Sequence, residues 1–451
     1  MPDQASTANE HHLMIHRLLR LGSEHGIVVV LVLLCAFFSL VTLKDQTATG
    51  ADAVAQVMGM LEGKAGVMIA VTDQPHDAAF ADLMKNELQR SGKPVAAVVK
   101  GDPKAAREAL QKLAAAGANI DAIVCHGASA TWLVFNDLAA DFPNLGNPPR
   151  IQPSSYRWPT FLKADNLLNI ANQIAVIAIL AIGMTMVVIT SGIDLSVGSL
   201  IALSAVVTTL LIRDVFGGVT AGSGGMFIAA IGGISLCGLS GWLSGLLITR
   251  MSVPPFIVTL GVMLMASGTA YRLAENQSVY QVPDSFVWLG RGTDLLRLPN
   301  AVVLMLVLYA FAHGVMTQTR FGRYLYAVGG NVEAALLSGV PVRRVIITAY
   351  LICGLLAGLG GVVTASLLKS GSPTYGGMYE LYVIAAVVVG GTRLSGGKGT
   401  IPGTLAGAFI IAVIQNGMNL TNVESNTQKI VLGLVILVAV LVDRLRGRSF
   451  S

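Results

Sequence analysis

A series of long apolar runs constrains this chain more than any other feature of its sequence. A transmembrane helix needs about 20 predominantly apolar residues, because in lipid every backbone N–H and C=O must be satisfied within the segment itself. Apolar residues occupy 53% of the 451 positions and charged residues only 12%, against about 25% charged residues in soluble domains. The sequence therefore predicts an all-α polytopic membrane protein with about ten transmembrane helices, at residues 26–43, 169–189, 197–212, 226–249, 255–272, 301–316, 345–366, 381–390, 405–416 and 430–442.

The first of these runs is followed by a stretch with the composition of a soluble domain. Residues 26–43 exceed the usual apolar length of a signal peptide, so we expect a retained helix after a tail of residues 1–25. In residues 44–158 the apolar residues fall into short blocks that alternate between strand and helix patterns. This alternation predicts a small α/β insert with a parallel sheet, with strands at 65–71, 95–100 and 121–125 and helices at 77–90, 102–116 and 128–139.

The distribution of lysine and arginine predicts the orientation, because short cytoplasmic loops carry an excess of both. With the N-terminus inside, an even number of helices places both termini in the cytoplasm of a bacterial inner membrane and the insert in the periplasm. The membrane core then covers residues 159–443, followed by a cytoplasmic tail at 444–451. The cytoplasmic side holds Arg250, Arg320, Arg323, Arg343, Arg344, Arg393, Lys398, Arg444, Arg446 and Arg448, and the opposite side holds Arg213, Arg291, Arg297, Lys369 and Lys429.

The loop after the sixth run contains one further predicted helix, which is too short to cross the membrane. Asn331 is a favourable N-cap, Gly339 suits the position after a helix end, and Pro341 prevents continuation. From the residues alone, two interpretations of this cytoplasmic helix stay open. It is either a plain connection between spans or a coupling helix that seats in a partner and transmits motion as a rigid body.

Four groups of residues resemble the permeases of ribose-type and xylose-type ABC sugar importers. The groups are GMT at 183–185 with GIDLSVGS at 192–199, VPPFIVTLG at 253–261, the segment 319–340, and the segment 385–404 with GGT and LSGGKG. The resemblance implies that the core at 159–443 is a permease that works as a homodimer, with a cytoplasmic ATPase subunit and a periplasmic sugar-binding protein as partners. The residues that would couple it to the ATPase are Arg320, Gly322, Arg323, Gly329, Gly330, Asn331, Glu333, Ala334, Ala335, Ser338 and Gly339.

The glycine-rich segment near Lys398 is not a phosphate-binding loop. The pattern G-x-x-x-x-G-K-[ST] requires glycine at 392 and serine or threonine at 399, where the chain has Thr392 and Gly399. We therefore expect ATP and Mg²⁺ on the partner subunit, and in this chain no catalytic residue, no cofactor and no metal site. The basic residues form no single patch of the kind that binds nucleic acid.

A path for an uncharged sugar requires neutral hydrogen-bonding groups and aromatic faces rather than fixed charge. Asp194 would cost about 2.5–3.5 kcal/mol at the bilayer centre, so we expect it either to cap the helix that follows or to face a cavity. Each of the other candidates could instead be an interhelical hydrogen-bonding residue. The candidate pathway residues are Asn169, Asn172, Gln173, Thr185, Asp194, Phe256, Thr259, Tyr382 and Asn416.

The predicted function is import of a monosaccharide or related polyol, with a periplasmic binding protein delivering the substrate and membrane lipid as the surroundings. One alternative is a secondary transporter or channel, for which buried ion-pairing carboxylates are expected but nearly absent. Another is an ABC permease for a different solute such as an amino acid, against which the segment 192–199 argues.

The insert between the first and second spans contains GVMIAVTD at 66–73 and DAIV at 121–124, which resemble the first half-lobe of periplasmic sugar-binding proteins. A complete sugar site needs two such lobes, and the insert is too short for both. It is either a passive solvated insert or a docking element for the binding protein.

Overall fold

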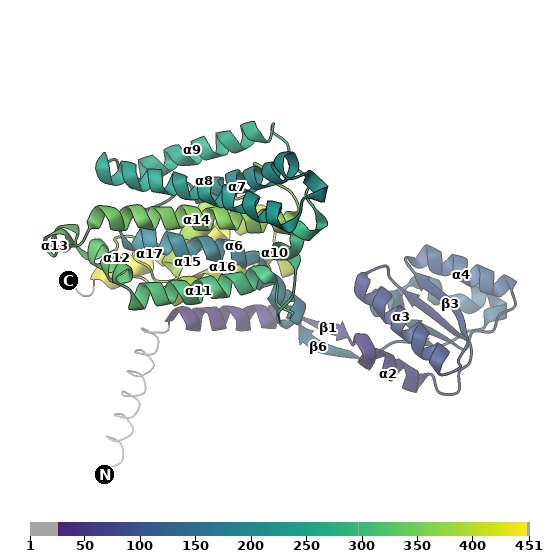
Figure 1. The fold of residues 1–451 in the computed structure, drawn as a ribbon. Coiled ribbons are helices and arrows are strands. Elements are labelled where there is room, and N and C mark those ends of the chain that lie inside the picture. The colour runs from purple at the N-terminus through teal and green to yellow at the C-terminus, as the bar shows by residue number, and fades with distance from the viewer. Residues whose placement is uncertain (1–25, 296, 449–451) are drawn as a thin grey trace, which may run out of the picture. The chain divides into compact units, whose positions relative to one another are not determined.

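A computed structural model describes residues 26–295 and 297–448, without the side chains of 439 and 442–448. The predicted tail of residues 1–25 lies outside the described residues, as do residues 449–451 of the predicted C-terminal tail. The chain divides into two compact units. One is the insert, Leu43–Pro159, and the other is a membrane unit formed by the remaining residues (Figure 1).

The membrane unit is almost entirely helical (Figure 1). Seven of its helices are long and apolar enough to cross a membrane: α6 (Ala164–Ile189), α7 (Val197–Leu210, extended to Val215 by a π-helical turn), α8 (Ser223–Arg250), α9 (Pro255–Leu273), α11 (Asn300–Gln318), α14 (Val342–Leu368) and α16 (Ile401–Leu420). Three shorter apolar segments overlap the other predicted spans at 26–43, 381–390 and 430–442: Gly26–Val41, α15 (Tyr379–Val389), and Ser425–Val438 within α17 (Ser425–Arg448). The described part of the unit also contains three short α-helices, α10 (Trp288–Arg291), α12 (Arg320–Gly330) and α13 (Val332–Leu337), and 3₁₀ turns at Thr160–Leu162, Gly218–Thr220 and Asp284–Val287.

The helices α6–α9 and α14–α17 form two similar groups that run in opposite directions. Gly183 of α6 packs against Cys353 of α14, while Gly360 packs against Leu180, so these two helices are antiparallel. In each group the second helix packs on the third, and the third helix packs on the first helix of the other group. Inverted repeats of this kind often enclose substrate sites at their interface in transporters.

Close glycine contacts hold these helices together. A Cβ added at Gly241 of α8 would lie 2.2 Å from the carbonyl oxygen of Tyr350 in α14. Small residues at helix contacts are needed in a membrane, where lipid supplies no hydrophobic drive between helices. Much of the glycine content of the chain is explained by such contacts.

In both groups the segment before the second helix is neither helix nor strand and turns back into the protein. Residues 190–196 carry Asp194 to a fully buried position before α7 begins. Residues 369–378 run along α7, because Gly371 packs against Thr209 and Gly376 packs against Gly198. Gly198 and Thr209 are about 16 Å apart along the axis of α7, which is roughly half of the hydrocarbon thickness of a bilayer. The starts of α7 and α15 therefore lie side by side inside the membrane unit.

The insert is a four-stranded parallel sheet in the order β3-β2-β4-β5, covered by helices. Its elements are α2 (Gly50–Met60), β2 (Val67–Val71), α3 (Pro75–Arg90), β3 (Val95–Lys100), α4 (Pro103–Ala115), β4 (Ala122–Cys125) and β5 (Arg150–Ile151). Phe80 and Met84 of α3 belong to the apolar core on one face, and Leu110 of α4 belongs to the core on the other. Antiparallel strands β1 (Leu43–Thr47) and β6 (Ser155–Pro159) form its base.

The predicted helix at 128–139 is wrong. The chain instead forms two 3₁₀ turns, Gly127–Thr131 and Leu133–Phe135, and the four-residue helix α5 (Leu138–Asp141). The Ser129 hydroxyl donates to Ala70 O of β2 and accepts a hydrogen bond from the His126 N–H. Side-chain bonds of this kind compete with helix formation, and Trp132 adopts an extended ψ of 127° where the helix would continue.

Candidate functional site

The short helix predicted in the cytoplasmic loop is confirmed as α13. Asn331 caps it, because its Oδ1 accepts a hydrogen bond of 2.9 Å from the N–H of Ala334. Gly339 follows the helix end with a φ of +78°, a left-handed conformation that favours glycine. Ala335 lies on the inner side of α13 and is buried. The outer surface of α13 carries the exposed apolar side chains of Val332, Leu336 and Leu337, with exposed fractions of 49%, 64% and 89%.

Helix α12 connects α13 firmly to the membrane unit. A Cβ at Gly329 would lie 1.7 Å from Ile189 O at the end of α6, and one at Gly322 would lie 2.2 Å from Met316 O. The Tyr326 hydroxyl donates to Gly399 O at 2.8 Å. Displacement of α12 must therefore displace α6 and the loop at 390–400 with it. The remaining predicted coupling residues Arg320, Arg323, Gly330, Glu333, Ala334 and Ser338 are exposed.

Three of the predicted pathway residues form hydrogen bonds within the helix bundle. Thr185 of α6 lies 2.7 Å from the Thr404 hydroxyl of α16. Asn416 of α16 exchanges hydrogen bonds of 2.8 Å and 3.0 Å with Asn166. Thr259 donates to Pro255 O within its own helix, at 3.0 Å. The contacts of Thr185 and Asn416 match the alternative of interhelical hydrogen bonding, whereas the bond of Thr259 to Pro255 O lies within its own helix.

The other neutral candidates lie on different surfaces. Asn169 and Gln173 are exposed near the start of α6, and Phe256 is exposed at the start of α9. Tyr382 is partly buried and meets Tyr379 edge to face, with ring centroids 6.4 Å apart. The Asn172 side-chain oxygen is buried and has no hydrogen-bond partner. The structure does not bring these residues together into one site.

Asp194 lies in the irregular segment before α7 and is fully buried. Its Oδ1 accepts hydrogen bonds from the Ser196 N–H at 2.9 Å and the Ser196 hydroxyl at 2.6 Å. The carboxylate therefore orders the turn that leads into α7, although Ser196 itself occupies the N-cap. Its second oxygen, Oδ2, has no hydrogen-bond partner.

A polar pocket of about 210 Å³ lies where α7, α9 and the turns of residues 373–378 meet. Ser199 of α7 and Ser267 and Tyr271 of α9 contribute to its wall, and Glu380 in the first turn of α15 contributes a carboxylate. None of these residues was among the predicted pathway residues. One signal in the sequence could have identified them: Glu380 is an ionisable residue beside an apolar run, and such residues in membrane proteins are commonly functional.

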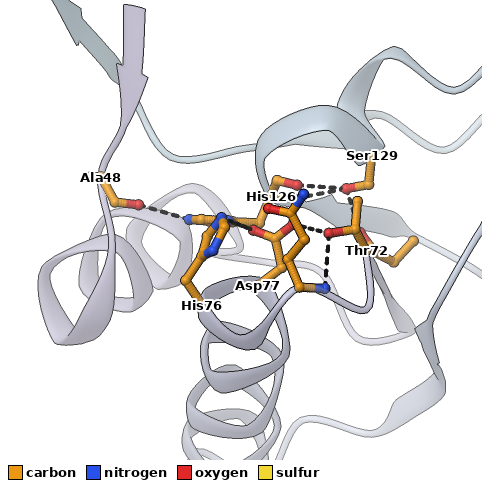
Figure 2. A network of polar contacts seen from close by, with 8 residues as sticks. Ala48, Thr72, His76, Asp77, His126 and Ser129 are labelled. Atoms are coloured by element: carbon orange, nitrogen blue, oxygen red, sulfur yellow. Dashed lines mark hydrogen bonds and ion pairs between the residues drawn. The ribbon is translucent and has the colours of Figure 1, made fainter. Parts of the chain in front are cut away.

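A second cluster of polar residues lies in the insert, after the carboxyl ends of β2 and β4 (Figure 2). Ligands bind at this edge in many open α/β sheets. Here His126 places Nδ1 2.6 Å from Asp77 Oδ1 and Nε2 2.9 Å from Ala48 O. The Thr72 hydroxyl donates to the other Asp77 oxygen, and the ring of Phe80 stacks on the imidazole at 4.5 Å.

The polar atoms of this cluster satisfy one another. His126 and Asp77 are both almost fully buried, with exposed fractions of 2%. The arrangement leaves no ring nitrogen free to act on a ligand, so the cluster stabilises the insert. In the part of the chain that the structure describes, no group of three or more His, Cys, Asp or Glu side chains is placed to hold a metal ion.

Comparisons with known proteins identify the membrane unit. The family described as branched-chain amino acid transport system / permease component matches residues 166–440. The ribose import permease protein RbsC of Escherichia coli is 42% identical over 289 residues, which cover 63% of this chain and 87% of RbsC. The D-allose transport system permease protein AlsC of Escherichia coli is 35% identical, covering 63% and 85% of the two chains.

The fructose import permease protein FrcC of Rhizobium meliloti is also 35% identical, covering 63% of this chain and 79% of FrcC. No solved structure matches the chain. The family match leaves out the insert, since it begins at residue 166. The chain therefore belongs to the family of transport-system permease components and is a multi-pass membrane protein.

Proposed function

We propose that this chain is the transmembrane subunit of an ATP-binding-cassette importer for a monosaccharide or related polyol. One observation carries the proposal: the membrane unit is 35–42% identical to import permeases named for ribose, allose and fructose, over most of their length. In this proposal the substrate is delivered by a periplasmic binding protein. ATP and Mg²⁺ are bound by a separate ATPase subunit, and this chain hydrolyses nothing.

The contact with the ATPase is proposed to be the outer surface of α13. Three exposed apolar side chains on a cytoplasmic helix of six residues are what a partner groove would bury. Because α12 is locked to the end of α6, movement of α13 would pass to the membrane-spanning helices as a rigid-body displacement. Two copies of the chain would enclose the path and alternate between the two sides of the membrane.

The proposed topology has ten spans, formed by the seven long helices and the three shorter apolar ones, with both termini in the cytoplasm. The excess of lysine and arginine on the side that carries α13 supports this orientation. The insert would then lie in the periplasm, where it is proposed to dock or position the binding protein.

A second solute class follows from the family description, which names branched-chain amino acids. An amino acid is a zwitterion, and its path would require fixed charges of both signs. In the described residues the polar pocket carries a carboxylate and no basic side chain, so it offers no ion-pair partner for the carboxylate of an amino acid.

The proposal is tested by purifying the chain with its ATPase and binding protein and measuring uptake into proteoliposomes. Radiolabelled D-ribose, D-allose, D-fructose and leucine are compared with and without ATP. We expect ATP-dependent uptake of at least one of the sugars and none of leucine. Uptake of leucine alone, or uptake of sugar without any ATPase, would contradict the proposal.

A matched pair of variants tests the contact with the ATPase. Leu337→Asp should abolish co-purification of the ATPase, because it places a charge on the apolar surface of α13. Leu133→Asp changes a similarly exposed leucine of the insert, with an exposed fraction of 78%, and should leave co-purification unchanged. Equal retention of the ATPase by both variants would exclude α13 as the contact.

A further inference from the structure

We propose that the pocket between α7, α9 and the start of α15 is a binding station for one monosaccharide on its way through the membrane, with Glu380 as the principal hydrogen-bond acceptor. This inference rests on the proposed function and adds a site to it. It is carried by three observations: the position of the pocket, the surroundings of Glu380, and the chemistry of the other lining groups.

The pocket lies where two interrupted spans meet. A Cβ at Gly198 in the first turn of α7 would lie 2.3 Å from Glu380 Oε2 and 2.5 Å from Gly376 O. The N-terminal ends of α7 and α15 therefore converge on the same point, each preceded by a segment that is neither helix nor strand. In transporters, discontinuous helices of this kind present their free helix ends to the substrate.

Glu380 is partly buried and has no ion-pair partner in the described part of the chain. Its position in the first turn of α15 is favourable for negative charge, because the helix dipole is positive there. The two oxygens of a carboxylate can accept a pair of hydrogen bonds, and these bonds are stronger than those made by a neutral acceptor. Two adjacent hydroxyls of a sugar supply such a pair of donors.

The remaining lining groups are neutral and suit a polyol. The hydroxyls of Ser199, Ser267 and Thr374 can each donate and accept. Tyr271 and Tyr375 add aromatic surface together with a polar tip. The volume of about 210 Å³ is smaller than the roughly 300–1,000 Å³ of pockets for drug-sized ligands. It therefore fits a single sugar ring rather than a disaccharide.

Thiol protection tests the pocket without the ATPase or the binding protein. Ser267→Cys is placed in the full chain in proteoliposomes and labelled with a small water-soluble methanethiosulfonate, with Ser285→Cys as an exposed control outside the pocket. The wild-type chain, whose four cysteines are buried or partly buried, gives the background. D-ribose, D-allose and D-fructose at millimolar concentration should slow labelling of Ser267→Cys at least threefold and leave Ser285→Cys unchanged.

The role of Glu380 is tested in the same assay and in ATP-driven uptake. Glu380→Gln should abolish the protection by sugar and lower uptake at subsaturating sugar at least tenfold, while binding-protein-stimulated ATP hydrolysis persists. Glu424→Gln, an exposed glutamate outside the pocket, should behave as wild type.

Three outcomes would overturn this inference. They are no labelling of Ser267→Cys, protection by Na⁺ alone instead of sugar, and unchanged sugar uptake by Glu380→Gln. Unchanged uptake by that variant would leave the importer function intact. Absence of uptake by the wild-type complex would instead count against the proposed function, and thiol protection would still decide the pocket.

Discussion

At the residue scale, the clearest consequence concerns the buried pair His126–Asp77 in the insert. Removing one partner of a buried, hydrogen-bonded ion pair costs about 3–5 kcal/mol, because the buried charge of the other partner is left uncompensated. His126→Ala should therefore destabilise the insert by an amount in that range. Pulse proteolysis of the full-length protein across a urea series would measure it, and wild-type resistance in this variant would contradict the structural role of the cluster.

His76 provides the matched control for that experiment. Its ring lies 3.2 Å from the same Asp77 oxygen, but the side chain has an exposed fraction of 57%. Exposed ion pairs contribute at most about 1 kcal/mol. His76→Ala should accordingly change the urea dependence little.

The hydrogen bonds of Asp121, the residue directly before β4, predict how the insert responds to acid. Its carboxylate accepts hydrogen bonds from the N–H groups of Gly66 at 3.0 Å and Ala65 at 2.9 Å, which lower the pKa of this side chain below its usual range. A lowered pKa in the folded state means that the ionised carboxylate contributes stability above the unfolded pKa, at about pH 4 and higher. This contribution is lost as the pH falls through the folded pKa.

Pepsin cleavage of the insert between pH 2 and pH 5 tests this sign. Near pH 5 the wild-type protein should be cleaved more slowly than Asp121→Asn. This difference in cleavage rate should become smaller as the pH falls toward 2. A difference that stays constant or widens in acid would show that the carboxylate charge does not stabilise the turn before β2.

At the scale of single elements, α13 offers a proline test of rigid coupling. The N–H of Ala335 donates to Asn331 O at 3.0 Å, so Ala335→Pro removes this bond and introduces a clash inside the helix. We expect loss of ATP-driven uptake with normal insertion into the membrane. Val332→Pro is the control, because the first helical position tolerates proline, the preceding Asn331 is already extended, and proline keeps this part of the α13 surface apolar. Full uptake by Ala335→Pro would exclude a rigid helix at this position.

The contact between the two interrupted spans makes a second prediction at this scale. Gly198→Ala forces a Cβ against the backbone of Gly376, and overpacking of this kind typically costs about 1–3 kcal/mol. Gly261→Ala in α9 meets nothing within 4 Å and should be neutral. On heating, the buried thiols of Cys237 and Cys353 should react with maleimide at a lower temperature in Gly198→Ala than in the wild-type protein, whereas Gly261→Ala should react as wild type does. Identical labelling curves for the two variants would contradict the close approach.

Most elements could be predicted from the sequence because their signals are local. The length of apolar runs locates the spans, and Asn331 with Gly339 determines α13. The prediction of a helix at 128–139 failed because Ser129 forms a hydrogen bond with β2, a strand that lies far away in the sequence. The pocket was missed for the same reason: only packing brings Ser199, Ser267 and Glu380 together, whereas Thr185 and Asn416 have the right chemistry but bond within the bundle.

At the scale of the whole molecule, the insert is the part that the matched relatives do not explain. It has its own parallel sheet and its own apolar cores, and the family match begins only at residue 166. The strands β1 and β6 bring Thr47 and Ser155 opposite each other. The insert is therefore an independent unit on a two-stranded base, and it can be removed there.

Replacing residues 48–154 by Asn-Gly keeps β1 and β6 as a hairpin, because this dipeptide favours the two-residue turn that joins antiparallel strands. If the insert docks the binding protein, the variant should still import sugar but require several times more binding protein for half-maximal stimulation of ATP hydrolysis. The maximal rate should stay near wild type, since the membrane unit and α13 are untouched. An unchanged requirement would make the insert passive, and a lower maximal rate at saturating binding protein would indicate a part in the transport step itself.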